Sequence, residues 1–315
     1  MTHLTLGLAQ LAPVWLDRAA TLDKVLATTE DAACQGADLL VFSEALVPGY
    51  PFWLELTDGA RFNDDVQKEL FALYSREAVD TDAGHLDGLC QLAREHGMMI
   101  VLGCIERAAD RSGHSLYCAA VTIDARGELA SIHRKLVPTF EERLAWAPGD
   151  GHGLRVHPCG PFTVGTLNCW ENWMPLARAA FHAQGEDLHL ALWPGQLRNT
   201  EDITPFLAKE GRSYVASSSG VLRPEDIPED FPQRERILEQ RPGFLGNGGS
   251  CLCAPDGSFV LEPLVGEEGL RVAELDPELV RRERQNFDPA GHYSRPDVLE
   301  LRVNRKRQAI ARFED

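Results

Sequence analysis

Short apolar runs recur along the chain and constrain its fold more than any other feature. Most are nearly continuous rather than strictly alternating in polarity, which is typical of strands whose sheets are covered on both faces. We therefore expect buried sheets with helices packed outside them. The runs are LTLGLAQ (4–10), ADLLVFSEA (37–45), MMIVLGCIE (98–106), SLYCAAVTI (115–123), FTVGTLNCW (162–170), LHLALWPG (188–195), SYVASSS (213–219), SCLCAP (250–255) and FVLEPL (259–264).

Helical periodicity separates several of these runs. Apolar residues recur at helical spacing over residues 19–35 and again over 85–96. A third helix is predicted to be capped by Asn172 and to end near Gly185. Its apolar face is formed by Trp173, Leu176, Ala177 and Ala180, and Pro175 is acceptable in its first turn.

The order of these elements predicts an α/β fold of one domain. Strands alternate with helices early on, and later strands pair across short turns at 124–128 and 254–258, which indicates an α/β or layered αββα arrangement. No linker rich in Pro, Gly or Ser divides residues 1–315. The charged, proline-rich segment 223–244 is predicted to be a surface excursion or lid, and a short C-terminal tail is predicted from about residue 303.

Composition excludes several classes of function. The formal net charge of −17 argues against binding to nucleic acid or to an anionic membrane, because either partner would require a basic face. No run of about 18 apolar residues predicts a membrane span, and the first residues lack the pattern of a signal peptide. We therefore expect a cytoplasmic protein. Its eight cysteines include no CxxC pair and are expected to be mostly reduced thiols.

A metal site is not expected. Cys251 and Cys253 lie two residues apart in an apparent strand, and alternate residues of a strand point to opposite faces. His152 and His292 lie in turn-like stretches without the i, i+4 pairing of zinc sites on helices. We therefore predict no metal site.

Cys169 is the best candidate nucleophile among the cysteines. It lies in LNCWENWMP, between an apolar run and the start of a predicted helix. A thiol at a helix N-terminus is expected to have a lowered pKa, because the positive end of the helix dipole stabilises the thiolate. The alternative is a structural cysteine, since free cysteine is among the most buried residue types.

Two further polar stretches follow strand-like runs. FSEALVPGYP places Glu44 at the end of one run, and HRKLVPTFEER places Lys135 after another, followed by Glu141 and Glu142. Residues at the carboxyl ends of strands in α/β folds are in position to line a site. The alternative for each is a solvated ion pair, because such side chains are mostly exposed.

Together the three polar stretches resemble a known family. Three stretches resemble, in this order, the Glu, Lys and Cys motifs of the nitrilase (carbon-nitrogen hydrolase) superfamily: FSEALVPGYP, HRKLVPTFEER and NCWENWMPLAR. The sequence around the cysteine is similar to that of the nitrilase branch. KEGRSYVASSSG, GGSCLCAPDG and GHYSRPDVLEL extend the resemblance over almost the whole chain. It implies a four-layer αββα sandwich and a homodimer or higher homo-oligomer formed through the helix after Cys169.

The resemblance also implies a role for each motif residue. Cys169 would be the nucleophile, Glu44 the general base, and Glu142 a second glutamate that positions the substrate and Lys135. Lys135 would stabilise the tetrahedral intermediate together with the backbone N–H of Trp170. The implied reaction is hydrolysis of a small organic nitrile to the carboxylic acid and ammonia, through a thioimidate and a thioester, without a cofactor.

Aromatic residues gather around the motifs and are candidates for substrate binding. We expect Tyr50, Trp53, Trp170 and Trp193 to line an apolar pocket suited to aryl or arylaliphatic nitriles. Glu55 is expected near the pocket mouth. The alternative is that most of these aromatic residues belong to the core or to an interface.

Other functions remain open at this point. An amidase or carbamoylase of the same superfamily would use the same three motif residues on an amide. A catalytically silent member would act as a binding or scaffold protein. A thiol redox sensor based on Cys169 would need a resolving cysteine nearby. The sequence leaves open the physiological nitrile, its stereochemistry, the ratio of acid to amide released and the size of the assembly.

Overall fold

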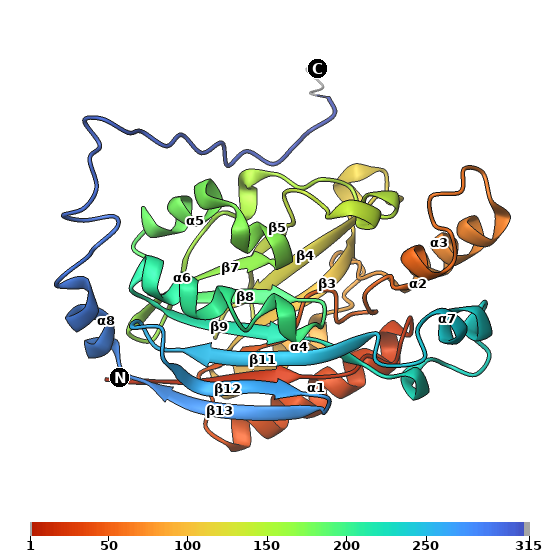
Figure 1. Cartoon of the computed structure of the whole chain (residues 1–315), viewed down its shortest axis with the longest axis horizontal. Coiled ribbons are helices and arrows are strands. Elements are labelled where there is room, and N and C mark those ends of the chain that lie inside the picture. Colours follow the sequence, from red (N-terminus) through yellow and green to blue (C-terminus); the bar gives the residue numbers. More distant parts are fainter. Residues whose placement is uncertain (1, 312–315) are drawn as a thin grey trace.

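A computed structural model of the chain describes residues 2–311, which form two stacked β-sheets (Figure 1). The first sheet has the strand order β13-β1-β2-β3-β4-β5. Strands β1, β2 and β3 run parallel, and their neighbours pair with them antiparallel. The strands are β1 (Leu4–Gln10), β2 (Leu39–Val41), β3 (Met99–Arg107), β4 (Leu116–Ile123), β5 (Leu129–Arg134) and β13 (Gly269–Leu275).

The second sheet has the order β10-β11-β9-β8-β7-β6, with β12 paired to β11. Its central strands β7, β8 and β9 run parallel. Leu6, Val101 and Leu190 belong to the apolar core between the two sheets. The strands are β6 (His157–Cys159), β7 (Phe162–Asn168), β8 (Leu188–Trp193), β9 (Tyr214–Ser219), β10 (Val221–Leu222), β11 (Gly246–Cys253) and β12 (Phe259–Val265).

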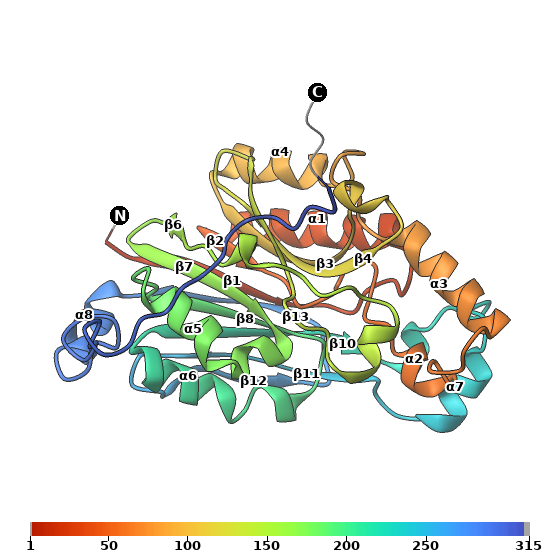
Figure 2. The same ribbon diagram turned by 90° about the horizontal axis from the view of Figure 1, so that it is seen from above.

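Helices cover the outer face of each sheet. Helices α1 (Arg18–Cys34) and α4 (Asp87–His96) pack on the first sheet, and α5 (Pro175–His182) and α6 (Ile203–Gly211) pack on the second (Figure 2). The near-continuous apolar runs are therefore explained, because each central strand is covered on both faces. The predicted four-layer αββα sandwich is confirmed.

The helix after Cys169 begins later than predicted. Cys169–Trp173 forms a separate 3₁₀ turn, and α5 starts at Pro175. The residue before a proline is disfavoured in the helical region, and Met174 is accordingly extended. The prediction that Asn172 caps this helix is wrong, because its side-chain amide donates instead to the carbonyl oxygens of Leu167 and Cys169.

Three short helices extend one end of the sandwich (Figure 1): α2 (Trp53–Leu56), α3 (Asp65–Glu77) and α7 (Arg234–Gln240). The predicted excursion 223–244 contains α7 and is only partly a surface feature. Its residues Ile227, Phe231 and Ile237 are buried in a cluster that also contains Trp15 and Trp53. Arg241 of this segment pairs with Glu55, with 3.2 Å between Nη2 and Oε1.

The last helix, α8 (Pro277–Arg284), leads into a long extended segment that crosses the outside of the sandwich (Figure 2). The tail predicted from residue 303 is described as far as residue 311, without helix, and residues 312–315 of that prediction lie outside the described residues. None of the helices between residues 2 and 311 has both the length and the apolar character needed to cross a bilayer.

Candidate active site

Glu44 follows β2 in a loop that lies directly against β3. A side chain at Gly103 of β3 would collide with the Ser43 carbonyl oxygen and crowd the Glu44 Cα, so glycine allows this approach. The Glu44 side chain is fully buried. Its Oε1 accepts from Lys135 Nζ at 2.7 Å and from Cys118 Sγ at 3.2 Å. Its Oε2 accepts no hydrogen bond from the described residues and is therefore available to take a proton.

Lys135 follows β5 directly and is 1% exposed. Its backbone N–H donates to the Cys118 carbonyl oxygen at 2.8 Å, which continues the pairing with β4. Its Nζ lies between Glu44 Oε1 at 2.7 Å and Glu142 Oε2 at 2.8 Å. Burial opposes the charge, but Cys169, Glu44 and Glu142 raise the pKa of Lys135 well above its usual value. Lys135 is therefore a fixed cation.

Glu142 lies in a 3₁₀ turn, Phe140–Leu144, and is 1% exposed. A capping box fixes its carboxylate, because Oε2 accepts from the backbone N–H of Thr139 at 2.6 Å. Its Oε1 accepts from the Tyr50 hydroxyl at 2.9 Å. Glu142 thus holds Lys135 on one side and Tyr50 on the other.

The environment of Glu44 suits a base that works near neutral pH. Burial raises its pKa to about 7, partly offset by the adjacent Lys135 and reinforced by Glu142. A carboxylate with such a pKa can accept a proton at pH 7 and return it later.

Cys169 opens a 3₁₀ turn at the end of β7 with a left-handed backbone, φ 49°. A positive φ is uncommon for a residue other than glycine, and backbone strain of this kind clusters at functional sites. A sulfur atom at this point and carboxylate oxygens of Glu44 and Glu142 all lie within 4.8 Å of one another. The Lys135 ammonium lies between the two carboxylates, where a metal cation would compete with it.

The prediction of a lowered pKa for Cys169 is wrong. Burial raises the pKa of its thiol well above the usual value, Glu44 raises it further, and Lys135 and the Trp170 backbone N–H oppose the change only in part. The turn is too short to provide a helix dipole, and Cys169 is only 3% exposed, so desolvation dominates. Cys169 therefore rests as a thiol and requires Glu44 as proton acceptor.

A buried network that the sequence analysis missed supports the Cys169 backbone. Asn172 donates to the Cys169 carbonyl oxygen at 2.8 Å, and its own Oδ1 lies 2.7 Å from His189 Nε2. His189 Nδ1 lies 2.8 Å from Glu186 Oε1. These residues are at most 4% exposed. The sequence signal for this network was His189 inside the apolar run 188–195, because a buried histidine needs a hydrogen-bond partner.

A second missed network joins the Lys135 and Cys169 segments. The Glu171 carboxylate accepts from the backbone N–H of Leu136 at 2.6 Å and of Asn168 at 2.9 Å. It also lies 3.0 Å from His133 Nε2. These contacts hold the pKa of Glu171 below its usual value although burial opposes them. Glu171 therefore ties the end of β5 to the end of β7.

A cavity of about 520 Å³ opens onto Cys169 and Glu142. Of the predicted substrate-binding residues, Tyr50 and Trp170 line it, and so does Glu55 as expected. Trp53 and Trp193 do not line it, and both are buried in the core. Trp53 packs edge-on against Tyr74, and Trp193 Nε1 donates to Ser217 Oγ. The remaining lining residues are Phe52, Thr139, Glu141, Trp173, Pro194, Gln196, Arg198, Asn199 and Arg241.

Comparison with known proteins identifies the family. Residues 5–285 match the family model described as carbon-nitrogen hydrolase. The chain belongs to the carbon-nitrogen hydrolase family. This carbon-nitrogen hydrolase is 34% identical to an aliphatic nitrilase of Rhodococcus rhodochrous, over 94% of its own chain and 81% of the relative. It is 33% identical to an arylacetonitrilase of Aspergillus niger, over 99% of its own chain and 92% of the relative.

A solved amidase of the nitrilase superfamily, from Nesterenkonia, has the same fold with a TM-score of 0.66 at 21% identity, covering 90% of this chain and 95% of the amidase. The predicted resemblance to the nitrilase branch of the carbon-nitrogen hydrolases is confirmed by the curated relatives. The protein is accordingly a hydrolase acting on carbon–nitrogen bonds.

Proposed function

We propose that this carbon-nitrogen hydrolase is a nitrilase that converts an organic nitrile and two waters to a carboxylic acid and ammonia. The observation that carries the proposal is the buried set of Glu44, Lys135 and Glu142 beside Cys169, at the end of a cavity. The nitrile substrate is proposed from the curated nitrilase relatives, at 33–36% identity.

In the first half-reaction, the Cys169 sulfur attacks the nitrile carbon while Glu44 takes the thiol proton. The C≡N bond becomes C=N, and the proton passes to nitrogen to give a thioimidate. The Lys135 ammonium and the Trp170 N–H stabilise the negative charge that develops on nitrogen. Donors fixed in place before reaction are effective because they need no reorganisation.

In the second half-reaction, Glu44 activates a water that adds to the thioimidate carbon. The tetrahedral intermediate expels ammonia and leaves a thioester on Cys169. A second water, activated in the same way, adds to the thioester, releases the carboxylic acid and restores the thiol. Glu44 thus accepts and returns a proton in each step, which its pKa of about 7 allows.

Two alternatives use the same fold. An amidase would need the same four residues and would release ammonia without the thioimidate stage, but the amidase similarity at 21% identity concerns the fold only. A catalytically silent scaffold is disfavoured on physical grounds. Burying the Lys135 ammonium beside two carboxyl groups carries a desolvation penalty of several kcal/mol, and buried titratable clusters of this kind gather at functional sites.

The test is ammonia release from phenylacetonitrile, mandelonitrile, benzonitrile, an aliphatic dinitrile, cyanide and the matching amides, with Cys169→Ala as the blank. Turnover of nitriles but not of amides supports the proposal. Turnover of amides without nitriles would assign the protein to the amidases. No turnover of either would contradict both and leave the silent scaffold.

Activity should depend on the ionisation of Glu44. Since the raised pKa of about 7 belongs to a base, kcat/KM for an uncharged nitrile should fall as the pH drops through 7. The decrease should approach about tenfold per pH unit below the midpoint. Ammonia release between pH 5 and 9, corrected for loss of folded enzyme, measures this profile. A rate that stays constant down to pH 5 would rule out Glu44 as the base.

Tyr50 and Trp170 are among the aromatic residues that line the cavity. We propose that Tyr50 and Trp170 contact the organic part of the nitrile, while Glu142 holds the Tyr50 hydroxyl. The relatives include an aliphatic nitrilase and an arylacetonitrilase at nearly equal identity, so the choice between these classes depends on the cavity itself.

We also propose a homodimer formed through α5 and its surroundings. Trp173, Leu176 and Phe206 are 46%, 69% and 48% exposed, and the Trp173 and Phe206 rings stack at 6.4 Å. Exposed apolar patches of this kind mark interaction sites. Sedimentation equilibrium should give a dimer or larger assembly, and Leu176→Glu should shift it toward monomer. A monomeric wild-type protein would contradict this proposal. The cytoplasmic location stays a prediction.

A further inference from the structure

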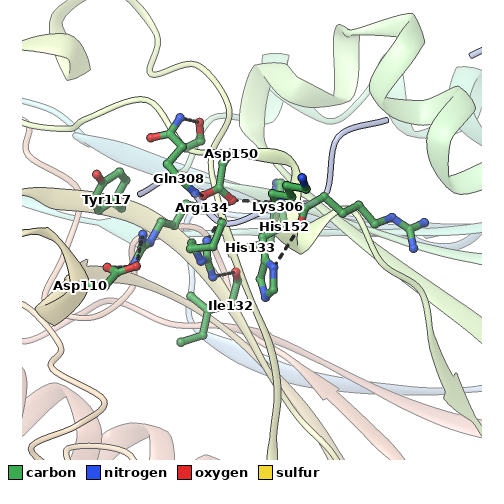
Figure 3. A network of polar contacts seen from close by, with 12 residues as sticks. Asp110, Tyr117, Ile132, His133, Arg134, Asp150, His152, Lys306 and Gln308 are labelled. Atoms are coloured by element: carbon green, nitrogen blue, oxygen red, sulfur yellow. Dashed lines mark hydrogen bonds and ion pairs between the residues drawn. The ribbon is translucent and has the colours of Figure 1, made fainter. Parts of the chain in front are cut away.

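The C-terminal segment 304–308 returns to the sandwich and contacts the turn 149–153, which leads from the Glu142 region to β6. Asp150 of this turn is 8% exposed. Its Oδ2 accepts from the backbone N–H of Gln308 at 2.8 Å (Figure 3). Its Oδ1 accepts from Arg307 Nη1 at 3.1 Å. Arg307 Nη2 also donates to the Ile132 carbonyl oxygen of β5 at 3.0 Å. The segment therefore joins the turn to the strand.

Further polar contacts join the segment 304–308 to neighbouring residues. Gln308 Nε2 donates to the Gly149 carbonyl oxygen at 3.0 Å, and its Oε1 accepts from Arg111 Nη2 at 2.6 Å. His152 Nδ1 lies 3.2 Å from the Arg305 carbonyl oxygen (Figure 3). By contrast, residues 286–303, which separate the segment from α8, are mostly exposed.

The turn 149–153 in addition packs against the end of β5, next to Lys135. The Gly149 N–H donates to the Lys135 carbonyl oxygen at 2.8 Å. An added Cβ would collide with the Arg134 carbonyl oxygen at Gly149 and with the His133 backbone at Gly153. The turn therefore lies directly behind His133, Arg134 and Lys135, whose side chains reach Glu171, Glu106 and the two catalytic carboxylates.

We propose that residues 304–308 act as a strap that positions Lys135, with Asp150 and Arg307 as positioning residues. The strap presses the turn onto the backbone of β5 and so fixes Lys135 between Glu44 and Glu142. This inference rests on the proposed catalytic role of Lys135. Displacement of a reacting group by about 1 Å can lower a rate by up to about a hundredfold, so loss of a remote contact is expected to reduce catalysis.

The test replaces Arg307→Gln and, as a matched control, Arg302→Gln. Arg302 contacts Glu300 on the exposed part of the same tail, and the charge change is identical. Arg307→Gln is expected to lower kcat by about ten- to a hundredfold with KM changed by less than about twofold, while Arg302→Gln leaves both unchanged. Asp150→Asn should act like Arg307→Gln, and the double variant should lose no more than the larger single loss.

A second readout needs no substrate. The Lys135 charge favours the Cys169 thiolate, so its displacement should slow alkylation of Cys169 by iodoacetamide at pH 8, measured on the Cys169 peptide by mass spectrometry. If Arg307→Gln and Asp150→Asn alkylate at the wild-type rate, or lose activity only in proportion to unfolded protein, the strap is refuted. If the wild type turns over no nitrile or amide, the proposed function fails while alkylation still tests the strap.

Discussion

Replacement of Cys169 by alanine is expected to abolish turnover and leave the fold intact. Among residues 2–311, the other thiol beside Glu44 belongs to Cys118, which does not line the cavity, so Cys169 is the group placed to form the thioimidate and the thioester. Loss of the nucleophile in a hydrolase that acts by covalent catalysis can lower kcat on the order of 10⁶-fold. The substitution removes one sulfur atom from a turn whose backbone is held by Asn172, so packing changes little.

The measurement is ammonia release combined with a thermal melt. Cys34→Ala is the matched control, because this cysteine is exposed at the end of α1 and does not line the cavity. The control should retain wild-type activity. Turnover by Cys169→Ala above a few per cent of wild type would rule out the covalent mechanism, whatever the substrate.

The strands could be predicted wherever burial on both faces made the sequence continuously apolar. Strands β1, β3 and β4 match their predicted ranges to within one residue. Strand β13 escaped prediction because GLRVAEL is only half-buried and its polar residues interrupt the run. Helix α3 escaped because only Leu70 and Tyr74 are buried along it. Partial burial leaves too weak a pattern in one sequence.

The sequence motifs predicted which four residues form the centre of the site. Glu44, Lys135, Glu142 and Cys169 lie together as their order in the motifs suggested. Trp53 and Trp193 show the limit of that reasoning, because proximity to a motif does not determine on which side of the chain a ring lies. The pKa of Cys169 shows another limit of sequence reasoning, because burial depends on tertiary packing that no local pattern reveals.

The supporting residues had no such motif. Asn172 was predicted only as a helix cap and Glu171 was given no role, although each binds backbone groups of the segment that holds the nucleophile. Asp150 lies between two glycines, GDG, which sequence reasoning takes as a plain turn. The glycines are needed because the C-terminal segment approaches on one side and β5 on the other. Contacts over more than 150 residues of sequence cannot be seen locally.

Replacement of Lys135 by methionine is expected to lower kcat by about 10²–10³-fold, the usual cost of removing one group that stabilises the charge of an intermediate. It should also destabilise the protein by about 3–5 kcal/mol, because Glu44 and Glu142 would be left buried without their cation. Activity and stability are thus both affected, and a fall in activity by itself would not separate the two.

The double variant Lys135→Met/Glu142→Gln separates them. Removing the Glu142 charge leaves one buried carboxyl, Glu44, which can hold a proton, so much of the lost stability in urea denaturation should return. The rate should not return, because neutralising Glu142 supplies no donor to the intermediate. Recovery of kcat together with stability would mean that Lys135 acts only as a structural counter-ion. Recovery of stability without kcat would mean that the lysine charge is needed for catalysis, either at the intermediate or to keep Glu44 ionised as the base.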